Sequence, residues 1–564
     1  MGRYKSSFGI VAALFFAGCS NDAPQTAQTP EADPVADSAA AQPESRPNIL
    51  LIVADDLGFT DLGAFGSEIP TPNLDRLAYQ GVRLTNLHNG PACQQTRIML
   101  MSGRGTSSMM DQHPPRPSRQ RTNSLTMSVA ALPELMKDAG YSTFMAGKWD
   151  LGLYGEARPA ARGFDRSFVL LEASASHFAE PLWEDGSYYE DDGVPVAFED
   201  LPQDFYSTRD YTNKMLGYLE EHDGNNPWFA FMPYTAPHWP IQLPDDWLDR
   251  NAGKYDAGWD ALREQRAARS TALGIAPDGA MDSFEPLALP WASLSEDEQM
   301  RYARAQEIYA GMVEYLDMSI GRIINHLEES GQLDSTVIVF MSDHGGSAAE
   351  HGVSTGRGYT GAGPAIPESR DNNFENFGRP LSFIDHGLGF GEAASAPLKY
   401  FKGRLAEGGL RAAAFIRYPE VISQPGIDDT FITAMDIVPT FLDIAGREHP
   451  GAGNYKDREI LPIEGETFWP YLSGESGTVH SPDYAAGWTA GDTGAIIRGN
   501  YKAINHAPPA RESDLANGMG MGMDAPPPWE LYDLSVDPGE TNDLAGTHPE
   551  ILSDLVAEWQ NNWQ

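Results

Sequence analysis

Cysteine is almost absent from this sequence. The 564 residues include only Cys19 and Cys93, so a scaffold of several disulfides is excluded. Basic residues are also scarce, because 39 Lys and Arg stand against 80 Asp and Glu, which gives a net charge of -41. A surface with this charge repels nucleic acid and anionic lipid headgroups, and we therefore expect no nucleic-acid partner. An anionic substrate would need a locally basic pocket inside this acidic protein.

The N-terminus has too little apolar length to cross a membrane. Residues 9–18 are apolar but fall short of the roughly 20 residues that a membrane-spanning helix needs. They follow a basic start and end at Ala17-Gly18-Cys19, which resembles a bacterial lipoprotein cleavage site. We expect residues 1–19 to be a lipoprotein signal peptide, with the lipid on Cys19 as the only membrane attachment. The alternative is an ordinary signal peptide with an incidental cysteine.

Such a signal predicts an exported lipoprotein, periplasmic or at the cell surface and anchored in the outer membrane. Residues 20–46 agree with this prediction, because they are rich in Ala, Pro, Asp, Glu, Gln and Ser and cannot bury a core. We expect them to form a disordered acidic tether. In an oxidising compartment Cys93 would be a lone thiol, which is either buried and inert or chemically special.

Short apolar runs alternate with helical patterns from about residue 47. The runs predict strands over 48–53, 141–146, 228–234, 336–341 and 412–418. The patterns predict helices over 72–80, 128–139, 211–222, 296–330 and 435–444. Thr71 is the expected cap of the first of these helices. This alternation favours an α/β domain with a mixed, mainly parallel sheet flanked by helices.

The pattern changes near residue 481, and we divide the folded chain there into a main domain, 47–480, and a smaller α+β subdomain, 481–564. In the subdomain, the residues 495–502 and 530–532 predict strands of a short antiparallel sheet, followed by a helix over 550–563. Four segments are expected to be insertions or surface loops: 106–123, 247–291, 347–379 and 506–528.

Polar residues follow several of the expected strands: Asp55, Asp56, Lys148, His238, Asp343 and His344. Because ligands bind beyond the carboxyl ends of strands in such sheets, these side chains are expected to gather at one edge. Three carboxylates at one point would raise one another's pKa unless a hard divalent cation joined them, and oxygen ligands favour calcium or magnesium. The alternative for Asp55-Asp56 is a turn cap, but a second strand ending in Asp343-His344 favours the cation.

The segment Gly90-Pro91-Ala92-Cys93-Gln94-Gln95-Thr96-Arg97, followed by Ser102-Gly103-Arg104, resembles the signature of sulfatases in the alkaline phosphatase superfamily. In that family the cysteine is oxidised to formylglycine. Further blocks match in order along the chain, at residues 48–58, 140–152, 163–166, 236–240, 342–345, 394–402, 407–409, 436–446 and 531–540. The blocks look closest to those of bacterial arylsulfatases.

The resemblance implies an alkaline-phosphatase-like fold and a sulfuric ester hydrolase of the arylsulfatase type. It assigns four ligands to one calcium ion: Asp55, Asp56, Asp343 and His344. Cys93, matured by a formylglycine-generating or equivalent enzyme, would supply the nucleophile as the hydrated aldehyde. One hydroxyl would attack sulfur and expel the alcohol, and the second would help to eject sulfate, so that one difficult step becomes two.

The same resemblance places three basic side chains on the sulfate oxygens: Arg97, Lys148 and Lys402. His238 would contact the sulfate and protonate the leaving oxygen as general acid. The substrate would be a sulfate ester of a small molecule or a carbohydrate. Trp239, Trp247, Trp259, Trp291 and the pair Tyr188-Tyr189 could stack on its ring, although a core role is the alternative for most of them.

Three residues depart from the family pattern. Gln95 stands where the maturation enzyme usually reads Pro or Ala. His344 stands where Asn is commoner. Asp150 stands where the family has a histidine that touches the formylglycine, and a carboxylate there could accept a proton, repel a sulfate oxygen, or pair with Arg97 or Lys148.

Two other functions remain open on the same fold. One is a phosphodiester, phosphonate or phosphate monoester hydrolase, whose two-zinc form would recruit His344, His386 and Asp385. The other is a degenerate sulfatase-like protein that binds anionic ligands without turnover, for which Gln95 and Asp150 are the only support.

Overall fold

The computed structural model describes residues 46–105, 109–112, 123–182, 189–277, 285–353, 369–491, 493–506 and 527–564. The expected signal peptide and nearly all of the expected tether lie outside the described residues, as do parts of the loops expected over 106–123, 347–379 and 506–528. Residues 46–564 form one compact unit. Among the helices described, none combines the length and the apolar character needed to span a bilayer.

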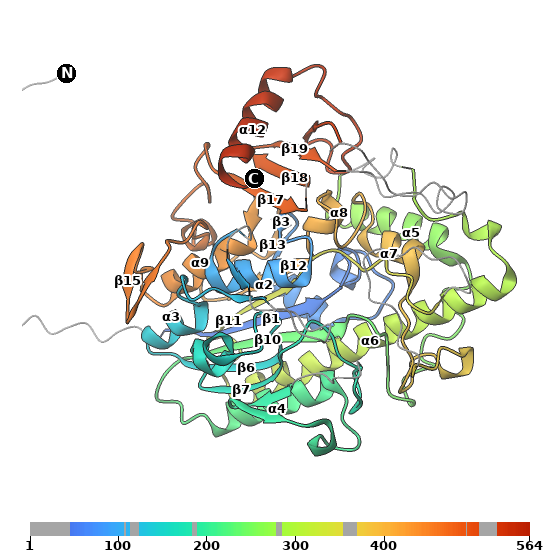
Figure 1. Ribbon diagram of the computed structural model, residues 1–564, viewed down its shortest axis with the longest axis horizontal. Helices are drawn as coiled ribbons and strands as arrows, with labels where there is room; N and C mark the ends of the chain where they lie inside the picture. The colour runs from blue at the N-terminus through green and yellow to red at the C-terminus, as the bar shows by residue number, and fades with distance from the viewer. Residues whose placement is uncertain are drawn as a thin grey trace, which may run out of the picture. The chain divides into compact units, whose positions relative to one another are not determined.

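A ten-stranded sheet forms the centre of this unit (Figure 1). Its middle strands run parallel, in the order β11 (Thr336–Ser342), β1 (Asn48–Asp55), β10 (Trp228–Pro237), β6 (Ser142–Lys148) and β7 (Arg166–Leu170). Beyond β11 lie β12 (Ala414–Arg417), β2 (Val82–Leu84) and β13 (Gly426–Asp428), and beyond β7 lie β8 (Tyr189–Asp191) and β9 (Val194–Val196). Antiparallel pairing is confined to these outer strands, so the expected mainly parallel sheet is confirmed.

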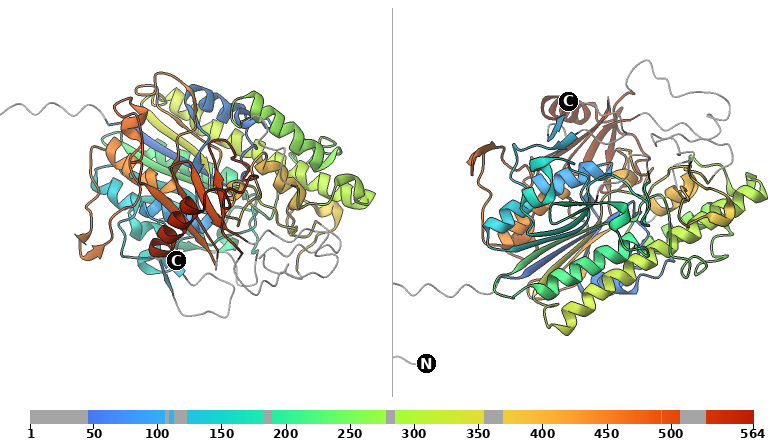
Figure 2. Two further views of the ribbon diagram at one scale, coloured as in Figure 1. Left: turned by 90° about the horizontal axis from the view of Figure 1, so that it is seen from above. Right: turned by 60° about the horizontal axis from the view of Figure 1, so that its bottom comes forward.

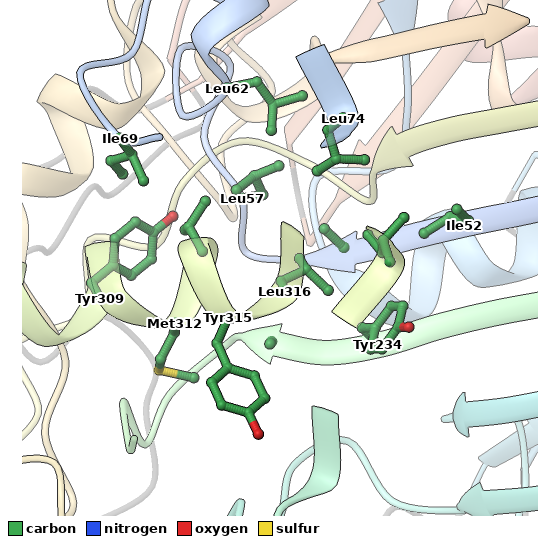
Figure 3. Packing of buried hydrophobic residues seen from close by; sticks show 14 of the residues in the cluster. Ile52, Leu57, Leu62, Ile69, Leu74, Tyr234, Tyr309, Met312, Tyr315 and Leu316 are labelled. Atoms are coloured by element: carbon green, nitrogen blue, oxygen red, sulfur yellow. The ribbon is translucent and has the colours of Figure 1, made fainter. Parts of the chain in front are cut away.

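The two faces of the sheet carry separate hydrophobic cores, because successive side chains of a strand point in opposite directions. Leu50 and Ile52 of β1 join one core, and Ile49 and Leu51 join the other. The first core lies under α1 (Pro72–Gln80), α4 (Ser207–Glu221) and α6 (Glu296–Glu329). Figure 2 shows α4 and α6 along one face of the sheet, and Figure 3 shows some of the core side chains, among them Ile52, Leu74 and Leu316. The second lies under α2 (Cys93–Ser102), α3 (Leu132–Asp138) and α9 (Ile437–Ile444).

Smaller elements complete the main part of the unit. They are the strand pairs β3 (Leu87–His88) with β14 (Ile432–Thr433), β4 (Met110–Gln112) with β5 (Asn123–Leu125) and β15 (Gly453–Tyr455) with β16 (Arg458–Ile460), and the short helices α7 (Gly387–Ser395), α8 (Glu407–Leu410) and α10 (Trp469–Leu472). The helix expected over 128–139 begins later, at Leu132, where Pro133 and Glu134 occupy its first turn.

The expectation of a surface loop over 247–291 is wrong for its central part, which forms α5 (Gly258–Ala272). This helix buries Trp259, whose ring centroid lies 4.8 Å from that of Trp291 and 5.6 Å from that of Phe390 on α7. Trp259 and Trp291 are therefore core residues. The apolar face of α5 packs on the core and holds the helix in place.

A four-stranded antiparallel sheet follows, from β17 (Ala485–Ala490), β18 (Thr493–Arg498), β19 (Tyr501–Asn505) and β20 (Glu530–Asp533). The single strand expected over 495–502 is wrong, because the chain turns at Gly499-Asn500, where Gly499 has a φ of 59°. One face of this sheet joins the second core through Ala495 and Ile497. The other face is covered by α12 (Pro549–Asn562), which contributes Leu555 and Trp559 (Figure 1).

The start of α1 is capped from another helix. Thr71 stands at the N-cap position, but its side chain makes no capping bond. Instead, the carboxylate of Asp317 on α6 accepts the backbone N–H groups of Asn73 at 3.1 Å and Leu74 at 2.8 Å. These are two of the N–H groups that a helix leaves without an internal partner, so Asp317 joins two helices of the first core.

We expect Asp317→Ala to lower the free energy of unfolding by about 1–3 kcal/mol, because two buried N–H groups lose their acceptor. Urea unfolding followed by circular dichroism measures this change. Glu328→Ala is the matched control on the same helix, since Glu328 pairs with Arg76 of α1 in a largely solvated position and is expected to change stability by less than about 0.5 kcal/mol. Equal effects of the two variants would contradict the capping role.

Candidate functional site

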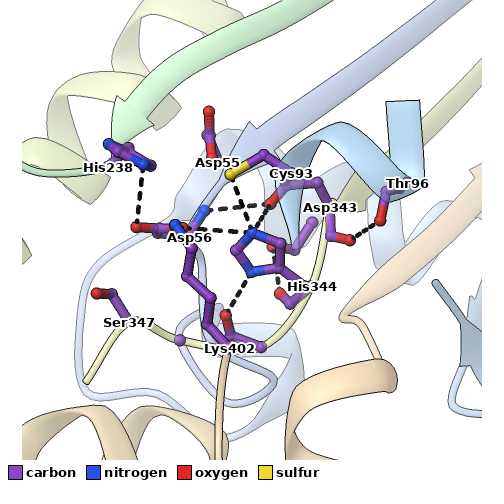
Figure 4. A network of polar contacts seen from close by, with 12 residues as sticks. Asp55, Asp56, Cys93, Thr96, His238, Asp343, His344, Ser347 and Lys402 are labelled. Atoms are coloured by element: carbon purple, nitrogen blue, oxygen red, sulfur yellow. Dashed lines mark hydrogen bonds and ion pairs between the residues drawn. The ribbon is translucent and has the colours of Figure 1, made fainter. Parts of the chain in front are cut away.

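Four neighbouring strands end at one point, and each delivers a polar side chain there. Figure 4 shows three of these side chains, Asp55, His238 and Asp343. Asp343 directly follows β11, Asp55 is the last residue of β1, His238 directly follows β10, and Lys148 is the last residue of β6. Because these strands are parallel, their carboxyl ends share one edge of the sheet. The structure thus brings together the residues that the strand ends indicated in the sequence.

The cation ligands expected from the sequence lie within one buried cluster. The side chains of Asp55, Asp56, Asp343 and His344 are completely buried. His344 Nε2 lies 3.4 Å from Asp56 Oδ1 and 3.4 Å from Asp343 Oδ1, and the Asp56 N–H donates to Asp343 Oδ1 at 3.2 Å. Ligand atoms of Asp55, Asp56, His344 and Cys93 all lie within 4.8 Å of one another.

Three carboxylate oxygens of this cluster fit a metal ion. Asp55 Oδ1, Asp56 Oδ2 and Asp343 Oδ2 are buried and accept no hydrogen bond from any residue that the structure describes. Buried oxygens of this kind nearly always have a partner. Burial and the charge of Asp55 also raise the pKa of Asp343 well above its usual value. A divalent cation would satisfy these oxygens and reverse that shift, and oxygen-rich ligand sets suit hard cations.

Cys93 is the first residue of α2, and its Sγ lies 3.3 Å from His344 Nε2. Thr96, one turn along the helix, donates through Oγ1 to the Asp343 carbonyl at 2.5 Å, which ties α2 to the cluster. Burial and Asp55 act to raise the pKa of Cys93, but Lys148, Lys402 and His344 outweigh them and hold it well below the usual value. Basic neighbours of this kind favour the thiolate over the thiol.

Basic side chains surround the same carboxylates. Lys148 Nζ donates to Asp55 Oδ2 at 2.5 Å, and Arg97 donates to the same oxygen at 3.3 Å. Lys402 Nζ donates to Asp56 Oδ1 at 2.6 Å. Arg97 and Lys148 are buried, whereas the Lys402 side chain is 19% exposed. The three basic side chains assigned to the sulfate oxygens thus lie together at the carboxylate cluster.

His238 lies at the edge of the cluster, with Nε2 at 3.7 Å from Asp56 Oδ2. Its Nδ1 lies 2.5 Å from the Trp239 carbonyl, which can only accept, so Nδ1 carries a proton. Burial lowers the pKa of His238 to about 3, against the raising effect of Asp56. Burial thus favours the neutral imidazole.

The departures from the family pattern have distinct surroundings. Gln95 Nε2 donates to the Thr489 carbonyl of β17 at 3.4 Å, so this side chain contacts the C-terminal sheet. Asp150 is buried and has a φ of 56°. Burial lowers the pKa values of Arg97 and Lys148, but Asp55 raises both and the charge of Asp150 adds to the increase. Of the roles open to Asp150, an electrostatic effect on these two cations is the one to which the pKa shifts point.

Asp385 and His386 do not belong to the cluster. The two ring nitrogens of His386 lie 2.8 Å from Gln306 Oε1 and 2.8 Å from the Ser347 carbonyl, and Asp385 accepts a hydrogen bond from Ser347 Oγ at 2.6 Å. Among the described residues, the group whose ligand atoms all lie within 4.8 Å of one another includes neither of them; it also leaves out Asp343, whose Oδ1 nevertheless lies 3.4 Å from His344 Nε2. The structure therefore offers no support for the two-zinc site.

Sequence reasoning missed the residues that hold the loop after β1. Asp61 Oδ2 accepts the Gly58 N–H at 2.7 Å and the Tyr309 hydroxyl at 2.6 Å, while Arg266 of α5 pairs with Asp61 Oδ1 at 2.5 Å. The Tyr309 hydroxyl also lies 3.1 Å from the Asp56 carbonyl. No local signal marks Arg266, because it lies in a segment expected to be a loop.

The ring-stacking candidates separate into two groups. Tyr189, like Trp259 and Trp291, is buried in the core, and Tyr188 lies outside the described residues. Trp239 is half-buried, and its ring centroid lies 4.6 Å from that of His238. Trp247 is also half-buried, and its ring centroid lies 4.8 Å from that of Tyr315 on α6. Trp239 is thus the aromatic side chain that adjoins the site.

Comparison with known proteins agrees with this geometry. The family model described as Sulfatase matches residues 47–447. An uncharacterized sulfatase of Schizosaccharomyces pombe is 38% identical over 541 residues, which cover 92% of this chain and 94% of that protein. The arylsulfatase of Klebsiella aerogenes is 34% identical over 442 residues, covering 76% of this chain and 93% of that protein.

A solved structure shows the same fold. The crystal structure of Ps i-CgsB in complex with k-i-k-neocarrahexaose aligns with a TM-score of 0.63 at 22% identity and covers 92% of each chain. The match of the family model over most of the folded chain, together with the identity to named sulfatases, confirms the resemblance seen in the sequence. The chain therefore belongs to the sulfatase family of sulfuric ester hydrolases.

Proposed function

We propose that this sulfatase cleaves sulfate monoesters of aryl alcohols or carbohydrates through a formylglycine made from Cys93, with one bound calcium ion. The observation that carries the proposal is the position of Cys93 Sγ, 3.3 Å from His344 Nε2 and inside the cluster of aspartates. A nucleophile at this point would face an ester whose oxygens are held by the cation and the basic side chains.

The calcium ion would be held by Asp55, Asp56, Asp343 and His344, and it would supply fixed positive charge for a sulfate oxygen. The aldehyde made from Cys93 would supply a hydrated nucleophile. Arg97, Lys148 and Lys402 would neutralise the charge that grows on the sulfate oxygens as the ester bond breaks. Their ion pairs with the aspartates hold them in place before the substrate binds, so little reorganisation is needed during the reaction.

His238 would give its proton to the leaving oxygen. Its Nδ1 is fixed by the Trp239 carbonyl, so Nε2 is the nitrogen that faces the cluster. The anionic substrate would raise the pKa of the imidazole and bring a proton to Nε2, which the alkoxide or phenoxide then takes. General acid catalysis of this kind contributes typically about 10²–10⁴-fold to the rate.

The proposed substrate class rests on the relatives and on Trp239. One relative is named an arylsulfatase, and a structural neighbour was solved with a neocarrahexaose. The half-buried Trp239 packs beside His238, His351 and Phe383, and its remaining exposed edge would contact an aryl or sugar ring of the substrate.

Mass spectrometry of the tryptic peptide 84–97, from protein made in its native host, tests the nucleophile directly. We expect the Cys93 thiol to be replaced by an aldehyde, which also requires a maturation enzyme that accepts Gln95. Turnover of an aryl sulfate measured beside the matching aryl phosphate separates the sulfatase from the phosphoryl-transfer alternative. An intact thiol in protein that still hydrolyses the sulfate ester would overturn the formylglycine proposal, and binding without turnover would favour the degenerate alternative.

We further propose that the mature protein is an exported lipoprotein attached to the outer membrane through Cys19. The basic start, the apolar residues 9–18 and Ala17-Gly18-Cys19 support this proposal. Labelled palmitate should enter the wild-type protein but not Cys19→Ser, and equal labelling of the two would contradict it.

A further inference from the structure

A buried charge cluster joins the C-terminal sheet to the segment that carries Lys402. Lys502 of β19 is completely buried, and its Nζ lies 2.8 Å from Glu407 Oε1 and 2.8 Å from Glu540 Oε1. Glu407, the first residue of α8, also pairs with His88 at 2.9 Å and with Arg411 at 2.9 Å. Glu540 Oε2 accepts the Glu407 N–H at 2.8 Å. The mechanism proposed above uses none of these groups.

Residues 399–408 form a closed loop between this charge cluster and the active site. At its base, the Gly408 N–H donates to the Lys399 carbonyl at 2.8 Å, and Lys399 Nζ donates to the Glu540 carbonyl at 3.0 Å. Near its tip, the Lys402 N–H donates to the Gly346 carbonyl at 3.1 Å. The loop therefore ties Lys402 to Glu540 through a short run of backbone contacts.

The loop has little room to shift. A Cβ at Gly408 would lie 2.3 Å from the Tyr400 carbonyl oxygen, and a Cβ at Gly345 would lie 1.7 Å from the Gly408 carbonyl oxygen. Gly345 directly follows His344, and the Gly403 N–H donates to the Pro91 carbonyl, two residues before Cys93, at 2.6 Å. A shift of the start of α8 would therefore be transmitted through these contacts to the segments that carry His344 and Cys93.

We infer that Lys502 is a positioning residue that sets the place of Lys402 by holding the carboxylates of Glu407 and Glu540 together. Two buried carboxylates this close repel each other unless a cation lies between them. Without Lys502 they would separate, and the start of α8 and the loop would move with them. The inference rests on the proposed function, because it assumes that Lys402 binds the sulfate group.

The test is a double-mutant cycle with inorganic sulfate as the ligand, measured by titration calorimetry on Lys502→Met, Lys402→Ala and the double variant. Sulfate affinity can be measured even where turnover is lost. We expect Lys502→Met to weaken sulfate binding roughly 10-fold in the wild-type background. In the Lys402→Ala background the same substitution should change the affinity by less than about 2-fold, because the group it positions is already absent.

Arg498→Met is the matched control, since Arg498 lies on the neighbouring strand β18 and pairs with Asp554 and Glu558 of α12 at the surface. It should leave sulfate affinity unchanged. If Lys502→Met does not fold, Lys502→Met with Glu540→Gln replaces it, because removing one carboxylate relieves the repulsion while the amide oxygen can still accept the Glu407 N–H. Because this pair lacks the repulsion that would move the loop, its sulfate affinity should stay within about 2-fold of wild type, and a roughly 10-fold loss would contradict the inference.

The outcomes separate the two proposals. Unchanged sulfate affinity and turnover in Lys402→Ala would overturn the role of Lys402 in the proposed function, and with it the inference. If Lys402→Ala weakens binding but Lys502→Met does not, the inference alone is overturned. An equal loss in both backgrounds would also overturn it, since a general structural effect does not depend on Lys402.

Discussion

Replacing Cys93 with alanine is expected to lower kcat/KM for an aryl sulfate by roughly 10³-fold or more while leaving the fold intact. The reason is the position of Cys93 at the start of α2, inside the cluster of aspartates and 3.3 Å from His344. No other cysteine belongs to the described part of the chain. Alanine leaves the helix and the basic side chains in place but removes the only source of the proposed nucleophile.

The measurement is steady-state turnover of protein whose Cys93 conversion has been determined by mass spectrometry, so that rates refer to matured molecules. Ser102→Ala is the matched control, because it removes a small buried polar group from the other end of α2. It should stay within a few-fold of the wild-type rate, and both variants should keep the wild-type circular dichroism. A Cys93→Ala protein with more than a tenth of the wild-type rate would exclude the covalent mechanism.

The strand ends explain why much of this site could be predicted from the sequence. Asp55, Lys148 and Asp343 each end or follow a buried apolar run, and parallel strands place their carboxyl ends at one edge. Local pattern was sufficient there because buried central strands are marked by continuous apolar residues. Lys402 was different, since it follows no strand, and only the resemblance to the sulfatase family placed it at the site.

Contacts between distant segments could not be predicted in this way. Asp317 caps a helix that begins more than two hundred residues earlier, and nothing in the sequence around Thr71 indicates that its side chain leaves this role to another residue. Lys502 reads as an ordinary charge on a short strand until its partners Glu407 and Glu540 are seen. The turn at Gly499-Asn500 was missed although Gly-Asn between two runs of this kind is a hairpin signal.

The structure also shows the surroundings of Gln95 and Asp150, two residues that depart from the family pattern. The Gln95 side chain contacts β17 of the C-terminal sheet, and this contact does not involve Cys93. A carboxylate at residue 150 would repel a sulfate oxygen, but it also adds to the larger effect of Asp55 in raising the pKa values of Arg97 and Lys148. This site therefore combines three basic side chains with four nearby carboxylates, so the proposed cation would be the main source of net positive charge for an anionic substrate.

Removal of the bound metal is therefore expected to abolish sulfate release, and calcium is expected to restore it. Without the cation, three buried carboxylate oxygens would have neither a metal ion nor a hydrogen-bond donor beside them. Repulsion among Asp55, Asp56 and Asp343 would then distort the site. At a calcium concentration 100 times the Kd, binding should stabilise the fold by about 2.7 kcal/mol. Magnesium should restore less activity, because it demands a near-ideal octahedral site.

Metal content and activity are measured after chelation, after dialysis and after return of each ion. Asp343→Asn should bind calcium at least roughly 10-fold more weakly, because it removes one ligand charge. Asp385→Asn is the matched control, since Asp385 is equally buried but bonds to Ser347 outside the cluster. It should retain one calcium ion per chain and wild-type turnover. Two zinc ions per chain, or loss of metal from Asp385→Asn, would instead favour the two-metal hydrolase.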